Sequence, residues 1–224
     1  MEEPVRVPAI PTPLRWLNTP VAWAAEGADA LTISAGAGTD WFLDPGTPGR
    51  FANAPALIGP LAEAGAGAPG GGAAGQRGAG DGTAAGDFVL TARVTAPLEA
   101  TYDAGALVVY AGETSWAKLC LELSPQGRPT LVSVVTRGVS DDANAFPVPG
   151  GDVLLRLARV GSAYAFHASL DGRFWHLIRY FALDAAGRAE AGFLAQSPTG
   201  QGLTVGFRDL AFARRTLRDL RDGS

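Results

Sequence analysis

Residues 116–123, Trp-Ala-Lys-Leu-Cys-Leu-Glu-Leu, alternate between two kinds of side chain. One set is wholly apolar and consists of Ala117, Leu119, Leu121 and Leu123. The other set is mixed and consists of Trp116, Lys118, Cys120 and Glu122. Because successive side chains of a β-strand point to opposite faces, the stretch predicts a strand whose leucines pack between two sheets. The mixed set is then expected on the outer, concave face of a sheet.

Ten further stretches alternate in the same way or are rich in branched and aromatic residues. They are residues 30–34, 39–43, 87–94, 105–110, 129–136, 153–160, 163–170, 174–181, 189–195 and 203–212. Short Gly-Ser and Asp-Gly turns predict that residues 153–181 form a three-stranded meander. About eleven short strands with Gly, Pro and Asp turns predict an all-β fold of two antiparallel sheets. Only residues 212–221 have a pattern that favours a short C-terminal helix, and residues 213–224 are expected to form a polar tail.

The composition agrees with a globular protein. The chain has 224 residues, is 47% hydrophobic, and contains 5 Trp, 10 Phe and 4 Tyr, so we expect one β-sandwich domain over residues 1–224. Residues 64–86 are mainly Gly and Ala, too poor in apolar surface to offset their ordering entropy. We expect a flexible surface insertion there. Its Gly65-x-Gly67-x-x-Gly70 pattern lacks the strand and the helix that a nucleotide site needs.

Charge and cysteine content exclude several classes of partner. The net charge is −4 and the pI about 5.2, which excludes a global basic field for nucleic acid or anionic membranes. Cys120 is the only cysteine, so neither an intramolecular disulfide nor a cysteine-rich zinc site can form. The sequence shows no secretion signal and no long apolar span. We therefore predict a cytoplasmic protein without metal or cofactor.

Nine short motifs occur along the chain in a recognisable order. They are LRWLN (14–18), TDWF (39–42), DFVL (87–90), YDAGAL (102–107), WAKLCLE (116–122), VSVVT (132–136), SDD (140–142), SLDGxxW (169–175) and AGFLAQSP (191–198). In this order they resemble the regulation-of-enolase-type proteins, a domain of unknown function in the concanavalin A-like lectin/glucanase superfamily. The resemblance covers about residues 14–212 and is interrupted by the Gly/Ala insertion. It implies a jelly-roll sandwich of two curved antiparallel sheets, in a superfamily of lectins, glycoside hydrolases and carbohydrate-binding domains.

The mixed face of residues 116–122 is the main candidate for a binding surface. A Trp ring stacks on the C–H groups of a sugar, and a cation and a carboxylate bond its hydroxyls, so Trp116, Lys118 and Glu122 suit a polar ligand. Lys118 and Glu122 lie ~13 Å apart along a strand, so each needs a partner on a neighbouring strand. Two interpretations stay open: a binding face, or cross-strand ion pairs on an exposed sheet.

Acidic residues near aromatic ones are expected to surround this face. Asp40, Asp103 and Asp141 are the candidates, with Asp142 next to the last, and Trp41 beside Asp40 is a further candidate for an exposed ring that contacts a ligand. Two carboxylates ~5–9 Å apart could hydrolyse a glycoside, whereas turn formation is the ordinary role of Asp in loops. The E-x-D-x-x-E signature of glucanases with a related fold is absent. Arg156 either borders the core or faces the same groove.

The histidines and the cysteine leave one further arrangement open. His167 and Cys120 could form a nucleophilic dyad, although a lone strand cysteine is ordinarily a small hydrophobe. His176 is expected in an aromatic cluster and Trp175 in the core. The sequence thus favours a binding or regulatory protein for a polar, carbohydrate-like ligand. The alternatives are a glycoside hydrolase-like enzyme using paired acids and a regulatory module that binds a protein partner.

Overall fold

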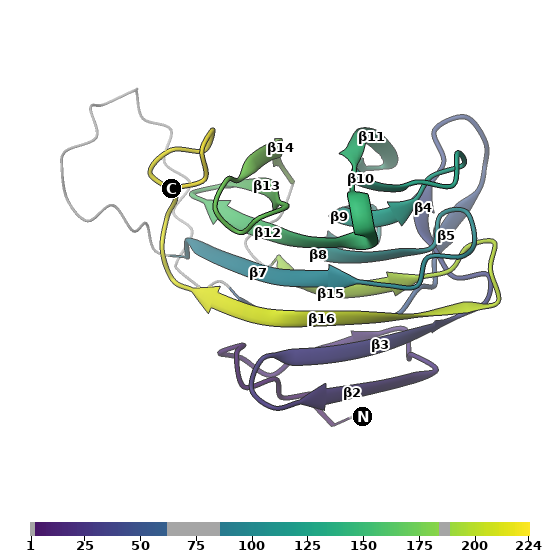
Figure 1. The fold of residues 1–224 in the computed structure, drawn as a ribbon, viewed down its shortest axis with the longest axis horizontal. Coiled ribbons are helices and arrows are strands. Elements are labelled where there is room, and N and C mark those ends of the chain that lie inside the picture. Colours follow the sequence, from purple (N-terminus) through teal and green to yellow (C-terminus); the bar gives the residue numbers. More distant parts are fainter. Residues whose placement is uncertain (1–2, 62–85, 184–188) are drawn as a thin grey trace.

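The computed structural model describes residues 3–61, 86–183 and 189–224 and contains two large antiparallel sheets (Figure 1). Sheet 1 contains, in spatial order, β1 (Arg15–Leu17), β6 (Ala56–Gly59), β15 (Glu190–Gln196), β8 (Ala104–Gly112), β9 (Ser115–Leu123), β10 (Pro129–Arg137) and β11 (Val139–Pro147). Sheet 2 contains β14 (His176–Ala182), β13 (Ala163–Ser169), β12 (Asp152–Val160), β7 (Phe88–Thr95), β16 (Gly202–Ala213), β3 (Ala30–Gly36) and β2 (Ala22–Glu26). A separate ribbon joins β4 (Trp41–Leu43) to β5 (Arg50–Ala52), and a 3₁₀ turn, η1 (Pro149–Gly151), precedes β12.

The structure confirms the predicted all-β sandwich. Each of the eleven predicted strands coincides with an observed strand to within two residues, and the β12–β13–β14 meander is present. The sequence did not reveal β1, β2, β5, β6 and β11. Of these, β11 is an exposed strand at the edge of sheet 1, with the sequence VSDDANAFP. An edge strand has one unpaired side and carries charges that discourage aggregation, so it shows no apolar alternation.

Two expectations outside the sheets have different outcomes. The predicted C-terminal helix is wrong: β16 continues to Ala213, which pairs with Val89, and residues 214–224 follow as bends and turns. The Gly/Ala insertion at 64–86 lies outside the described residues except for Gly86. Within the described residues, no helix is long and apolar enough to span a membrane.

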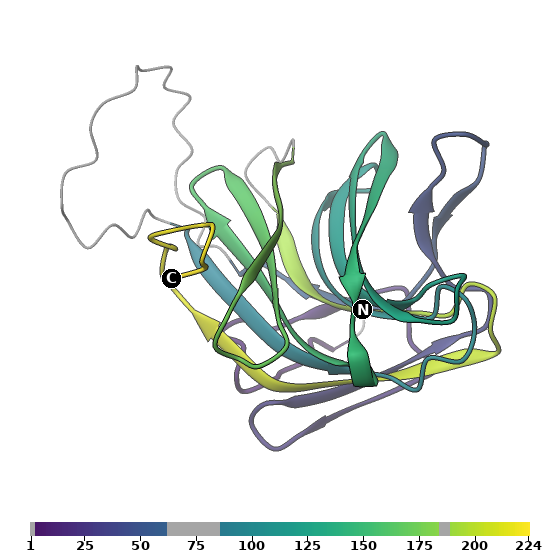
Figure 2. The same ribbon diagram turned by 45° about the horizontal axis from the view of Figure 1, so that its top comes forward.

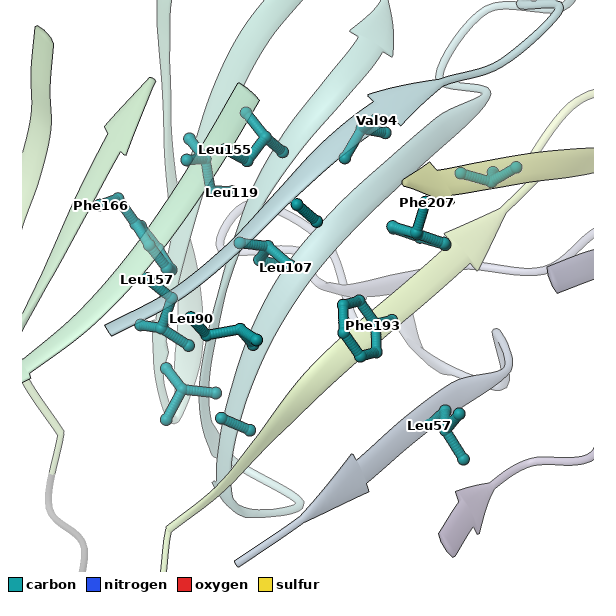
Figure 3. Packing of buried hydrophobic residues seen from close by; sticks show 14 of the residues in the cluster. Leu57, Leu90, Val94, Leu107, Leu119, Leu155, Leu157, Phe166, Phe193 and Phe207 are labelled. Carbon is teal, nitrogen blue, oxygen red and sulfur yellow. The ribbon is translucent and has the colours of Figure 1, made fainter. Parts of the chain in front are cut away.

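The main core lies between the two sheets, as the alternation in β9 predicted. Ala117, Leu119 and Leu121 are fully buried there. Figure 3 shows Leu107, Leu119 and Phe193 of sheet 1 facing Leu90, Leu157 and Phe207 of sheet 2.

The two sheets approach each other closely at Gly105. A Cβ atom on Gly105 would lie 2.4 Å from Val205 Cγ1 and 2.8 Å from Val94 Cγ1, so only glycine fits.

A second apolar cluster covers the opposite, outer face of sheet 1. It includes Trp116 and Cys120 of β9, Ala106 and Val108 of β8, and Trp41 and Leu43 of the β4–β5 ribbon. The ribbon is held to β11 through the Leu43 amide, which donates to Ser140 Oγ at 2.9 Å. The central strands of sheet 1 are therefore buried on both faces.

Truncation at the sheet interface should destabilise the protein strongly. Leu119→Ala removes a fully buried side chain, and we expect the free energy of unfolding to fall by ~2–5 kcal/mol. Urea denaturation measures the change. Val139→Ala, at a position 49% exposed on β11, is the control and should change stability by less than ~0.5 kcal/mol. A similar loss of unfolding free energy in both variants would contradict the assignment of Leu119 to the face of β9 that packs between the sheets.

Candidate functional site

A cavity of about 280 Å³ lies on the outer face of sheet 1, beside the β4–β5 ribbon. We call it the Lys118 pocket. It is lined by Asp40, Phe42, Asp44, Tyr102, Lys118, Glu122, Val132, Val134, Asp142 and Gln196. Strands β9, β10, β11 and β15 supply the sheet residues, whereas the ribbon and the loop before β8 supply Phe42 and Tyr102. The pocket thus combines charged groups with two aromatic rings.

Lys118 is the buried cation of this pocket. Its side chain is 2% exposed, and its ammonium donates to Gln196 Oε1 at 2.6 Å and lies 3.5 Å from Asp40 Oδ1. The residues opposite Lys118 on the adjacent strands are Val108 and Val134. The cross-strand ion pair considered from the sequence is therefore wrong for Lys118. Its carboxylate partner comes from the segment that leads into the ribbon.

Glu122 lines the same pocket without a hydrogen bond or ion pair to any described residue. Burial raises the pKa of its carboxyl to about 7. The nearby Lys118 opposes this rise, whereas the negative charges of Asp40 and Asp142 add to it. Near neutral pH this carboxyl can therefore either donate or accept a hydrogen bond.

Tyr102 forms the exposed aromatic rim. Its side chain is 43% exposed and its backbone is left-handed, with φ of 70°. The Tyr102 amide donates to the Leu123 carbonyl at 2.8 Å, and its own carbonyl accepts from Gln196 Nε2 at 3.1 Å. Gln196 therefore links the rim to Lys118.

Asp103 supports this rim and does not itself line the pocket. It is 1% exposed, and its Oδ1 accepts from the Ser197 hydroxyl at 2.7 Å. Its Oδ2 accepts from the Ala100 amide at 2.9 Å. The prediction that Asp103 contacts a ligand is wrong, because these bonds use a carboxylate that is fully enclosed. Its role is to hold the loop that presents Tyr102.

The two predicted tryptophan platforms are also buried. Trp116 is 0% and Trp41 2% exposed, and their rings lie edge to face at 5.5 Å. Trp41 Nε1 donates to the Ala54 carbonyl at 2.9 Å. The expectation of an exposed Trp on an open sheet face is wrong because the β4–β5 ribbon covers that end of the sheet. Both rings border a separate cavity of about 310 Å³ that Asn18, Arg50 and Glu113 also line.

Asp141 and Arg156 lie outside the Lys118 pocket. Asp141 Oδ2 accepts from Arg179 Nη2 of β14 at 2.9 Å, on the face of β11 opposite to Asp142. Asp142 therefore occupies the position predicted for Asp141. Arg156 is on β12 of sheet 2, so the interpretation that it shares a groove with Glu122 is wrong.

The Cys120–His167 dyad is not formed. Cys120 lies on β9 in sheet 1, where burial raises the pKa of its thiol to about 12. His167 is on β13 of sheet 2, and its Nε2 bonds the Leu220 carbonyl at 2.8 Å. His176 does join an aromatic cluster, 4.9 Å from Phe146 and 4.7 Å from Phe174 between ring centroids. Over the described ranges, no three His, Cys, Asp or Glu side chains are grouped to hold a metal ion.

Of the eight predicted site residues, the structure brings together Lys118, Glu122 and Asp40. Asp142, named from the sequence beside Asp141, also lines the pocket, whereas Phe42, Asp44, Tyr102, Val132, Val134 and Gln196 were not predicted. Tyr102, Asp142 and Gln196 belong to the short motifs at 102–107, 140–142 and 191–198. Their presence in these motifs was the only available signal, because the four strands meet only in the folded sheet.

Residues 81–215 match the family described as "Protein of unknown function (DUF1349)". The chain belongs to this family. A relative of this chain in sequence is "Regulation of enolase protein 1" of Saccharomyces cerevisiae, 30% identical over 125 residues. The match covers 54% of this chain and 62% of the yeast protein, so the chain spans less than two thirds of that relative.

Solved structures share the fold of this DUF1349 protein. A functionally unknown protein from Saccharomyces cerevisiae superposes with a TM-score of 0.70 at 22% identity, over 89% of this chain and 95% of the yeast chain. The protein described as "Bacteroides ovatus Xyloglucan PUL GH43B" gives a TM-score of 0.61 at 16% identity, over 95% of this chain and 40% of that chain. The K247S mutant of the GH43 protein BlXynB from Bacillus licheniformis gives a TM-score of 0.60 at 13% identity. The match covers 89% of this chain and 36% of the BlXynB chain. At these identities the likeness is one of fold.

The raised pKa of Glu122 predicts a pH-dependent stability. The ordinary pKa of 4.5 rises to about 7 in the folded protein, so the folded state holds this proton more tightly. Between pH 4.5 and about pH 7 the Glu122 carboxyl is ionised in the unfolded chain but still protonated in the folded protein. The free energy of unfolding therefore falls as the pH rises through this range. Glu122→Gln cannot ionise. We expect its free energy of unfolding to exceed that of the wild type by up to ~3 kcal/mol near pH 8 and to match it near pH 4.

Urea denaturation of both proteins at the two pH values makes this comparison. Glu113→Gln, in the exposed turn between β8 and β9, controls for the loss of a carboxylate. The same pH dependence in the two variants would show that Glu122 is not the group responsible.

Proposed function

We propose that this DUF1349 protein is a binding protein that holds a polar ligand of the carbohydrate class in the Lys118 pocket. The observation that carries the proposal is the arrangement of Glu122 and Tyr102. Glu122 is a carboxyl group without a protein partner in the described chain, and Tyr102 is an aromatic ring held at the rim in a left-handed conformation. Both groups are positioned by the fold and both retain unused binding capacity.

The chemistry of the pocket suits a sugar. The Tyr102 ring and the half-buried Phe42 offer apolar faces to C–H groups. Glu122 and Asp142 offer carboxyl oxygens to the hydroxyls of a sugar. The bonds from Lys118 to Gln196 and Asp40 hold the Lys118 ammonium in place within the same pocket. At about 280 Å³ the cavity is at the small end of ligand sites, which favours a small group such as one sugar ring.

The fold likeness supports a binding role. The GH43 matches cover 36–40% of those enzyme chains, so most of each enzyme lies outside the similarity. We propose that the sandwich belongs to the concanavalin A-like lectin/glucanase superfamily and that residues 1–224 act as one domain. A cytoplasmic location stays a prediction.

Glycoside hydrolysis is the second candidate function. Glu122, with a pKa of about 7, has the property of a general acid near neutrality, and Asp142 in the same cavity could serve as the second carboxylate. Release of sugar from an oligosaccharide that is lost in Glu122→Gln, with binding retained, would establish catalysis.

A regulatory role through a protein partner is the third candidate. It rests on the name of the yeast relative and on the edge strand β2 of sheet 2. At that edge Val21 is 75% and Trp23 45% exposed.

Loss of the rim ring should abolish ligand binding without unfolding the protein. We expect Tyr102→Ala to weaken the binding of oligosaccharides found on a glycan array by about tenfold or more, because the stacking surface is lost. Isothermal titration measures the affinity. Tyr180→Ala is the matched control, since Tyr180 is 54% exposed and lies on β14 of sheet 2. Equal affinities in Tyr102→Ala and the wild type would contradict the proposed site.

A further inference from the structure

Residues 214–224 fold back over the outer face of sheet 2 beside β12 and β13 (Figures 1 and 2). We call them the Leu217 segment. Leu217 is 4% exposed and packs with Val89, Ala158 and Ala165 of the sheet. This contact buries the apolar part of the face. The polar part lies next to it, around Arg156.

Arg156 is a buried cation with no acidic partner among the residues that the structure describes. It is 6% exposed, and its guanidinium carbon lies 3.6 Å from the centroid of the Trp175 ring. Its Nη1 donates to the Gly223 carbonyl at 2.6 Å. Its Nε is enclosed and makes no hydrogen bond, and no described carboxylate pairs with the guanidinium. Burial, and then the charge of Arg215, lowers the pKa of Arg156 to about 10.

His167 leaves a second buried nitrogen without a partner. Its side chain is 0% exposed. Because a carbonyl only accepts, Nε2 must donate to the Leu220 carbonyl, whereas Nδ1 has no partner. Burial and the Arg156 charge lower the pKa of His167.

The acidic residues of the Leu217 segment do not pair with Arg156 or His167. Asp219 Oδ1 accepts from the Arg221 amide at 2.7 Å, and Asp222 Oδ1 accepts from the Ser224 amide at 2.9 Å. Both carboxylates therefore close turns within the segment. Arg156 and His167 accordingly form a buried polar pair whose only described hydrogen bonds are to two backbone carbonyls.

The geometry of Arg156 indicates what would satisfy it. The edge of a guanidinium that carries Nε and Nη2 binds two oxygens of a carboxylate or a phosphate side by side. In this structure that edge makes no hydrogen bond to a described residue, and the Gly223 carbonyl engages only Nη1. The stacked Trp175 ring fixes the plane of the guanidinium.

We propose that the outer face of sheet 2 contains a binding site for a carboxylate or phosphate group, centred on Arg156, which the Leu217 segment covers. The Gly223 carbonyl bonds Nη1, next to the edge that the ligand would bind. Because Arg156 is almost fully enclosed, the ligand and the segment compete for it. Only glycine fits at position 223, where the segment contacts Arg156. A Cβ atom there would lie 2.8 Å from Arg156 Nη1 and 3.0 Å from Trp175 Cβ, and the φ angle of Gly223 is +74°.

Gly223→Ala in the full chain tests the proposal. The added methyl group should unseat the segment, so trypsin should cleave after Arg215, Arg218 and Arg221 faster than in the wild type, as followed by intact mass. Isothermal titration with inorganic phosphate and with acetate, at constant ionic strength in sodium chloride, then measures the site. We expect at least one anion to bind about tenfold more tightly to Gly223→Ala. The two arms show whether phosphate or carboxylate is preferred.

The double variant Arg156→Lys, Gly223→Ala is the matched control. It keeps the charge but loses the two-oxygen edge, so the gained affinity should disappear. A released segment without binding of either anion overturns the proposal and leaves Arg156 as a structural latch. Equal binding in the double variant overturns it as well. If Gly223→Ala stays resistant to trypsin, Leu217→Ser removes the apolar anchor. Resistance there also overturns the proposal, since such a segment could not yield to a ligand.

Discussion

The burial of β9 on both faces is the constraint on which the rest of the structure depends. One face packs against sheet 2 through Leu119 and Leu121, and the other against the β4–β5 ribbon through Trp116. Between Trp116 and Leu121 this strand has no solvated side, so a charge there must be paired or hydrogen-bonded. Lys118 is that charge, and its ammonium binds Gln196 and Asp40.

The same requirement gathers the candidate site. To reach Lys118, Gln196 comes from β15 and Asp40 from the segment before β4, and Gln196 in turn binds the carbonyl of Tyr102. Glu122 has no such partner, and its raised pKa records the burial of a group that the protein leaves unsatisfied. A partnered cation beside an unpartnered carboxyl is what distinguishes the Lys118 pocket from the surrounding apolar sheet face.

On sheet 2 the structure uses buried charge differently. Arg156 is enclosed by a segment of the chain that supplies a backbone carbonyl and no carboxylate. Strands β9 and β12 therefore each carry one enclosed cation on an outer face, yet among the described residues only Lys118 has an acidic partner. The Leu217 segment and the β4–β5 ribbon play matching roles, because each covers an outer face that a free sandwich would expose to water.

The sequence by itself determined the sandwich and the faces of its strands, because period-two alternation follows directly from the geometry of a β-strand. It also placed Lys118 and Glu122 on one face. Only the tertiary structure decided that Trp116 and Trp41 are buried, that Asp142 replaces Asp141, and that Tyr102 forms the rim. The burial of the tryptophans depends on the β4–β5 ribbon, the place of Asp142 on the register of β11, and the place of Tyr102 on the loop before β8. Such segments are too short and too polar to show a periodic pattern, and their positions are set by long-range contacts that alternation along one strand does not encode.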